Sequence, residues 1–152
     1  MVNFQELKQI APQLNQESDG LQATLQKIQD NIKAVNVGLH VWLEDEISSR
    51  EIPSVHPDGC RCTQDVYLGY SKTHAGWGIA IQERVNYLKY DSYGDSEWEI
   101  YSTSEPQLLL KASREIRIAA LEHLQALVDS ITQKAKASIV KIKKAKQLAN
   151  EL

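Results

Sequence analysis

The sequence predicts an α+β protein of α-β-β-β-β-α order, in which long N- and C-terminal helices pair antiparallel and flank a four-stranded antiparallel meander. Two observations support this fold class. Apolar residues recur at heptad spacing near both ends of the chain, and between these segments their period changes to two. A length of 152 residues suits a single domain with its own core. We therefore expect one domain over 1–152, divided into a helical segment 1–36, a sheet 37–103 and a long helix 104–152.

Two interleaved heptad series predict the N-terminal helix. Pro12 removes a backbone donor and Gly20 is a weak helix former, so we expect a kink or break within 11–20. The two series are Phe4, Ala11, Ser18, Leu25, Ile32 and Leu7, Leu14, Leu21, Ile28, Val35.

Four runs of alternating residues predict the strands. A loop containing Pro53 and Pro57 lies between Glu44 and Gln64 and separates the first two runs. The short segment 74–76 predicts a hairpin turn between the second and third runs, and the segment 91–95 connects the third run to the fourth. The alternating apolar positions are Leu39, Val41, Leu43; Val66, Leu68, Tyr70; Trp77, Ile79, Ile81, Val85; and Trp98, Ile100.

The last segment is predicted to be a helix because Ser104-Glu105-Pro106 resembles a helix start and neither Gly nor Pro follows before Leu152. A helix of about 45 residues is about 68 Å long, whereas a domain of this size has a radius of gyration near 15 Å. The helix must therefore project from the domain or break. The alternative is a break near Asp129-Ser130 that folds the helix back onto the sheet.

The apolar stripe of this helix is wider than one helical partner covers, which predicts self-association. The simplest arrangement is a dimer whose paired helices form a four-helix bundle. The predicted interface residues are Leu121, Leu124, Leu127, Val128, Ile131, Ile142 and Leu148.

One face of the predicted sheet combines aromatic, charged and small residues, which suits a binding surface for a protein partner or a small ligand. The surrounding segment 44–105 is acidic, with five Lys/Arg against twelve Asp/Glu, and suits a basic partner. The competing interpretation is an ordinary solvated sheet face. The predicted binding residues are His40, Trp42, Tyr67, Arg84, Glu99 and Tyr101.

His56, Cys60 and Cys62 are weak candidates for metal ligands, because zinc sites use four ligands and this set is incomplete unless two protomers share a site. The competing interpretation is a loop with two reduced thiols. We therefore expect neither a metal nor a cofactor.

The sequence lacks recognisable catalytic motifs, which disfavours an enzyme. A metal-dependent nuclease would need a lysine two positions after a strand carboxylate, and the segment Glu97-Trp98-Glu99 lacks one. Nucleophile-elbow, phosphate-loop and dinucleotide motifs do not occur. We expect a non-catalytic, oligomeric interaction protein that inhibits, adapts or regulates another macromolecule, with itself and a protein as partners.

Two alternatives to this function remain. The oligomer could sequester a small polar or nucleotide-like ligand, or the six lysines of the C-terminal segment 133–152 could contact nucleic acid. The second alternative is the weaker one, because these lysines are spread around the helix. The absence of a membrane-length apolar run or a signal segment, together with only two cysteines, predicts a cytoplasmic location.

Overall fold

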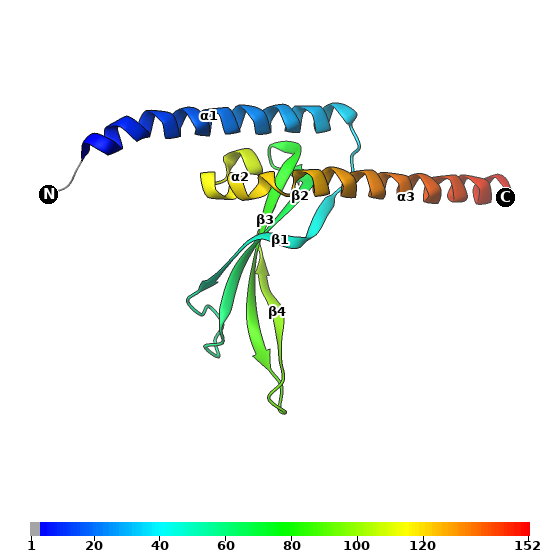
Figure 1. The fold of residues 1–152 in the computed structure, drawn as a ribbon. Coiled ribbons are helices and arrows are strands. Elements are labelled where there is room, and N and C mark those ends of the chain that lie inside the picture. Colours follow the sequence, from blue (N-terminus) through cyan, green and yellow to red (C-terminus); the bar gives the residue numbers. More distant parts are fainter. Residues whose placement is uncertain (1–3) are drawn as a thin grey trace.

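The computed structural model describes residues 4–152 and confirms the predicted fold class, with a helix, an antiparallel meander and further helices in chain order (Figure 1). A short fifth strand pairs with the third, and none of the helices in the described range is both long and apolar enough to cross a bilayer. The elements are α1 (Phe4–Val35), β1 (Val41–Ile52), β2 (Cys62–Thr73), β3 (Gly76–Tyr90), β4 (Ser96–Thr103), β5 (Gln107–Leu108), η1 (Leu109–Lys111), α2 (Arg114–Leu121) and α3 (Leu124–Asn150).

The sheet has the order β1-β2-β3-β4, and all neighbouring strands are antiparallel. β2 and β3 form the predicted hairpin, which closes where Thr73 pairs with Gly76, a glycine with a φ of 98°. β1 is longer than expected, so the predicted loop between Glu44 and Gln64 shrinks to residues 53–61. Register shifts on both sides of Glu46 allow β1 to continue through its charged segment while the side chains there stay exposed.

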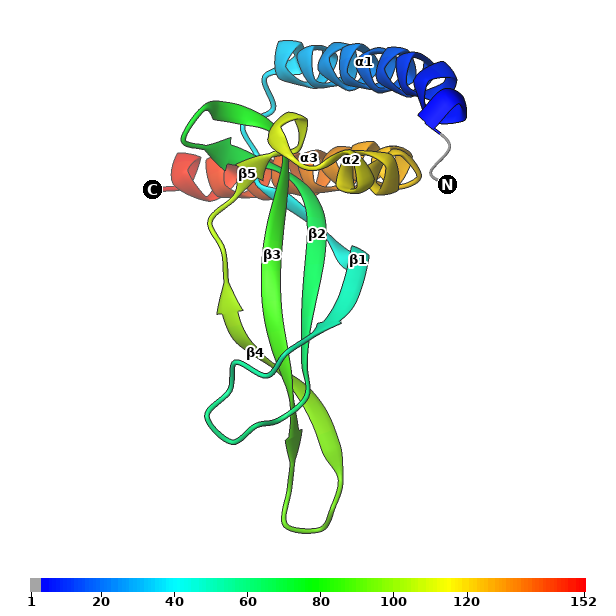
Figure 2. The ribbon, with the colours of Figure 1, turned by 90° about the vertical axis from the view of Figure 1, so that its left-hand side faces the viewer.

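The main hydrophobic cluster lies at the end of the sheet nearest the helices. Val66, Leu68 and Tyr70 of β2 form a cluster with buried residues of α2 and α3. α1 packs on the same end of the sheet, where its Gln29 lies against Gly78, and Figure 2 shows the tip of the β2–β3 hairpin between α1 and α3. The opposite end of the sheet projects away from all the helices, and the C-terminal half of β3 with β4 forms an arm (residues 86–103).

The predicted break in α1 is absent, because the helix is continuous through 11–20. The first turns of α1 curve away from the rest of the helix (Figure 2). Pro12 lies in this part of α1, and because proline has no backbone N–H, one helical hydrogen bond is missing there. A helix of 32 residues tolerates this loss and the weak propensity of Gly20, because its C-terminal half is held by burial of Leu25 and Gln29.

The prediction of one helix over 104–152 is wrong. Residues 107–111 form β5 and η1, and α2 begins only after Ser113, whose hydroxyl accepts a hydrogen bond from the amide of Ile116. The helical structure is interrupted again at Glu122-His123 and not near Asp129-Ser130, since α3 is continuous through the latter pair. Both interruptions adjoin residues that the core buries, which shows that tertiary packing decides where these helices begin and end.

The two long helices do not form the expected antiparallel pair within one chain. They run in the same direction in both views and are offset along their length, so that the start of α1 and the end of α3 extend at opposite ends of the molecule (Figures 1 and 2). We call residues 4–20 the α1 overhang and residues 136–150 the α3 overhang. The packing contacts of α1 are with β3, η1 and α2, whereas α3 packs on β1 and β2.

Burial also divides the predicted oligomer interface. Leu124, Leu127 and Ile131 lie in the core of the single chain, so they are unavailable to a second copy, and their assignment to an interface is corrected. The other predicted interface residues remain exposed, namely Leu121, Val128, Ile142 and Leu148.

Candidate functional site

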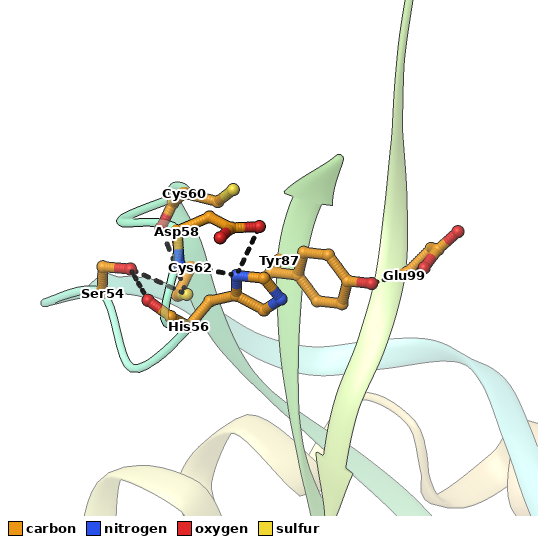
Figure 3. A network of polar contacts seen from close by, with 7 residues as sticks. All are labelled: Ser54, His56, Asp58, Cys60, Cys62, Tyr87 and Glu99. Carbon is orange, nitrogen blue, oxygen red and sulfur yellow. Dashed lines mark hydrogen bonds and ion pairs between the residues drawn. The ribbon is translucent and has the colours of Figure 1, made fainter. Parts of the chain in front are cut away.

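Three different metal-ligating side chains converge in the loop between β1 and β2. One ligand atom from each of His56, Asp58 and Cys60 lies within 4.8 Å of the others, and Figure 3 shows the three side chains together at the edge of the arm. Within residues 4–152 this is the one group of three His, Cys, Asp or Glu side chains with such spacing. Nδ1 of His56 lies 3.7 Å from a carboxylate oxygen of Asp58 and accepts a hydrogen bond from the Asp58 amide at 3.2 Å.

Aromatic rings of the arm hold His56 in place. Its imidazole stacks on the ring of Tyr87 with centroids 4.3 Å apart, and the ring of Tyr101 approaches edge-on at 5.7 Å. Only 18% of the His56 side chain is exposed. The Tyr87 hydroxyl in turn donates to Glu99 at 2.5 Å, so a chain of contacts fixes the loop against β3 and β4 (Figure 3).

The structure corrects the predicted ligand set in this loop. Cys62 is fully buried, and its thiol donates to the carbonyl of Cys60 at 3.4 Å and contacts the Ser54 hydroxyl at 3.8 Å, so it does not belong to the cluster. Asp58 takes its place. The spacing of His56, Asp58 and Cys60 at every second position was the signal that could have identified this set. The segment also contains two prolines and a glycine, however, so it does not read as a strand in which alternate side chains share a side.

The predicted binding face is divided by a β-bulge. A register shift in β4 lies between the pairs Val85↔Ser102 and Asn86↔Ile100, which places Glu99 opposite Tyr87. Because a one-residue shift moves side chains to the other face, Glu99 and Tyr101 lie with Tyr87 and not with Arg84. The expected set of six residues therefore does not form one surface.

The other four predicted residues, His40, Trp42, Tyr67 and Arg84, contact one another or nearby residues of the sheet. Arg84 lies over the ring of Tyr67 at 4.0 Å, His40 pairs with the Ser71 hydroxyl at 2.8 Å, and Trp42 lies against Gly69. Lys134 of α3 also donates to the carbonyl of His40. These contacts give the side chains a packing role on β2 and β3.

The same bulge creates an exposed apolar surface that the sequence pattern did not reveal. Tyr90, Trp98 and Ile100 share one face of the arm and are 47–59% exposed. We call these three residues the arm patch. Tyr93 lies exposed in the adjacent turn, and the exposed acidic residues Asp91 and Asp95 belong to the same turn beside the arm patch. An exposed aromatic patch with an acidic rim is typical of a protein-binding surface.

Glu99 provides a test of the network beneath His56. Hydrogen bonds from Tyr87 and then Lys89 lower the pKa of Glu99 below its ordinary value of 4.5. Replacing Tyr87 with phenylalanine is expected to raise the Glu99 pKa, because the bond with the larger effect is lost. Stabilisation from this carboxylate is present above the ordinary carboxyl pKa and disappears as the pH falls through the depressed folded-state pKa.

An NMR titration of the side-chain carboxyls measures this change. Tyr101→Phe is the control, because it removes a hydroxyl from the neighbouring ring and leaves both bonds to Glu99 in place. An unchanged Glu99 midpoint in Tyr87→Phe would show that the hydroxyl does not hold the carboxylate in solution.

Comparison of the chain with protein-family models, curated proteins and solved structures found no match.

Proposed function

We propose that this protein is a non-catalytic, homo-oligomeric interaction protein that associates through its two overhangs. The observation that carries the proposal is the apolar surface that the single chain leaves uncovered there. Phe4, Leu7, Ile10 and Leu14 follow one another at helical spacing on the α1 overhang and are 48–60% exposed. The α3 overhang exposes Ile139, Val140, Ile142 and Leu148 by 51–66%.

Charge supports pairing between unlike overhangs. The α1 overhang carries Lys8 against Glu6, Glu17 and Asp19, whereas the α3 overhang has five lysines and no acid. Two copies related by a twofold axis would place the α1 overhang of each chain beside the α3 overhang of the other, running antiparallel. The antiparallel pairing predicted from the sequence then occurs between chains, and the closed, self-complementary dimer covers the apolar row of the α1 overhang and part of the apolar surface of the α3 overhang.

Light scattering and sedimentation over a range of protein concentrations test this assembly. The unmodified chain is expected to have the mass of a dimer, and Leu7→Glu or Ile142→Glu is expected to shift it to monomer, because each places a carboxylate among the exposed apolar residues of its overhang. Gln16→Glu is the matched control, since it adds the same charge to an exposed position two residues from Leu14, on a different side of α1.

The mass measurements also show what would contradict the dimer. A concentration-independent monomer mass for the unmodified chain would overturn the proposal. A loss of association in Gln16→Glu equal to that in Leu7→Glu would reduce the effect to charge alone. Circular dichroism of each variant separates dissociation from unfolding.

The arm patch favours a second role within the same proposal, namely binding of a basic protein by the dimer. Exposed aromatic anchors with an acidic rim match a partner that offers apolar pockets among lysines and arginines. This agrees with the expected role of an inhibitor, adaptor or small regulator, although the surface lies on the arm and not on the residues expected from the sequence. Two reduced cysteines are consistent with a cytoplasmic location.

The alternative functions have less support from the geometry. A sequestered small ligand would need the set His40, Trp42, Tyr67 and Arg84 to face an open site, yet these side chains pack on neighbouring residues. Nucleic-acid binding would use the lysines of the α3 overhang, which the proposed dimer pairs with acidic residues of α1.

A further inference from the structure

We propose that the loop between β1 and β2 binds one Zn²⁺ ion through Nδ1 of His56, a carboxylate oxygen of Asp58 and the thiolate of Cys60, with water as the fourth ligand. This site is independent of the proposed dimer. The donors are an imidazole nitrogen, a carboxylate oxygen and a thiolate, all of which zinc accepts. The sulfur and nitrogen donors disfavour Ca²⁺ and Mg²⁺, which prefer oxygen ligands alone.

The spacing of the donor atoms is close to that of a tetrahedral site. Zinc bond lengths place neighbouring ligand atoms about 3.3–3.5 Å apart in a tetrahedron. The His56–Asp58 separation is 3.7 Å, and the three donor atoms lie within 4.8 Å of one another. A closure of at most about 1.5 Å therefore brings the three donor atoms to tetrahedral spacing. Gly59 lies between Asp58 and Cys60 with a φ of 68°, in the turn that brings Cys60 back toward His56.

The ring of His56 is already held beside the other two ligands. Its Nδ1 accepts a hydrogen bond from the Asp58 amide, so Nε2 carries the proton, and the Nδ1 lone pair becomes available to zinc once this bond is released. Stacking on Tyr87 and the edge contact with Tyr101 fix the ring plane. Zinc binding would replace one weak loop hydrogen bond with a metal bond, at little cost in side-chain ordering.

Such a site would couple the loop to the arm. His56 contacts Tyr87 of β3, and Tyr87 bonds to Glu99 of β4, so a metal held by residues 56–60 also secures the loop against both strands of the arm. Asp58 is exposed and Cys60 is partly exposed, which gives the ion a path from solvent.

Cobalt and zinc titrations of chelator-treated, reduced protein test the site. Co²⁺ is expected to bind with one equivalent per chain and to give a thiolate-to-cobalt absorption band that Zn²⁺ abolishes by displacement. Cys60→Ser is expected to remove the band and weaken Zn²⁺ binding at least tenfold in calorimetry. Asp58→Asn should retain the band and weaken binding by at least about tenfold, because loss of a direct ligand should cost no less than loss of a group that only supports one. Cys62→Ser is the matched control and should retain both the band and the stoichiometry.

A second measurement avoids variants altogether. Zn²⁺ is expected to slow alkylation of Cys60 in the unmodified chain, as followed by peptide mass spectrometry, and to leave the already buried Cys62 unaffected. A band that persists in Cys60→Ser, equal alkylation of Cys60 with and without Zn²⁺, or absence of Zn²⁺ binding to the folded protein would each overturn the proposal.

Discussion

Replacing Leu127 with alanine is expected to lower the free energy of unfolding by about 2–5 kcal/mol. The Leu127 side chain has 0% exposure and lies in the core cluster with Leu124, Ile131 and the apolar residues of β2. Truncation removes buried methyl groups and leaves a cavity that α3 cannot fill without moving away from the sheet. Because small domains are stable by only about 5–15 kcal/mol, this one change removes a large share of the total.

Urea unfolding followed by circular dichroism measures the loss, and Val128→Ala is the control. Val128 is the next residue of the same helix but is 38% exposed, so its truncation should cost less than about 1 kcal/mol. The comparison also tests the correction made to the predicted interface. A core residue lowers stability equally at all protein concentrations, whereas an interface residue would have an effect that grows with concentration.

Periodicity predicted the elements well where local chemistry sets them. The change from heptad to alternating spacing located the sheet, and the turn after Thr73 located the central hairpin. What periodicity does not contain is the identity of the packing partner. Leu124 and Ile131 lie seven residues apart and pack on the chain's own sheet, whereas Leu121 and Val128, which are also seven residues apart, remain exposed. An apolar stripe shows that a face is buried and leaves open whether a sheet or a second copy covers it.

The candidate sites depended on details that have no period. One extra residue in β4 places Glu99 and Tyr101 on a different face from the predicted one and leaves Trp98 and Ile100 exposed. The alternation of apolar and polar residues in this strand did not indicate the bulge. The metal-ligand loop was located by its residue types, but its ligand set was not. Loop closure around Gly59 turns Cys60 toward His56, while Cys62 is already the first residue of β2 and is buried.

Replacing Gly69 with alanine is expected to destabilise the fold by about 1–3 kcal/mol. An added Cβ at this position would lie 2.4 Å from Cε3 of Trp42 and 2.5 Å from the carbonyl oxygen of Val41. The indole can rotate, but the carbonyl belongs to β1 where Trp42 pairs with Gly69, so relief requires a shift of the paired strands. Gly69 is therefore needed for close approach of β1 and β2, and its φ is not what demands glycine.

Gly20→Ala is the matched substitution and should have the opposite sign. Gly20 lies within α1 and nothing approaches its added Cβ within 4 Å, so alanine should raise stability by about 0.5–1 kcal/mol through helix propensity. Equal stability of Gly69→Ala and the unmodified chain in urea unfolding would show that β1 yields easily at this point. The expected loss of stability would instead show that the Trp42 indole packs closely on Gly69. Weakened partner binding in Trp42→Ala would then report a disturbed β1–β2 pair, which is why the arm patch, far from this contact, is the better place to test recognition of a partner.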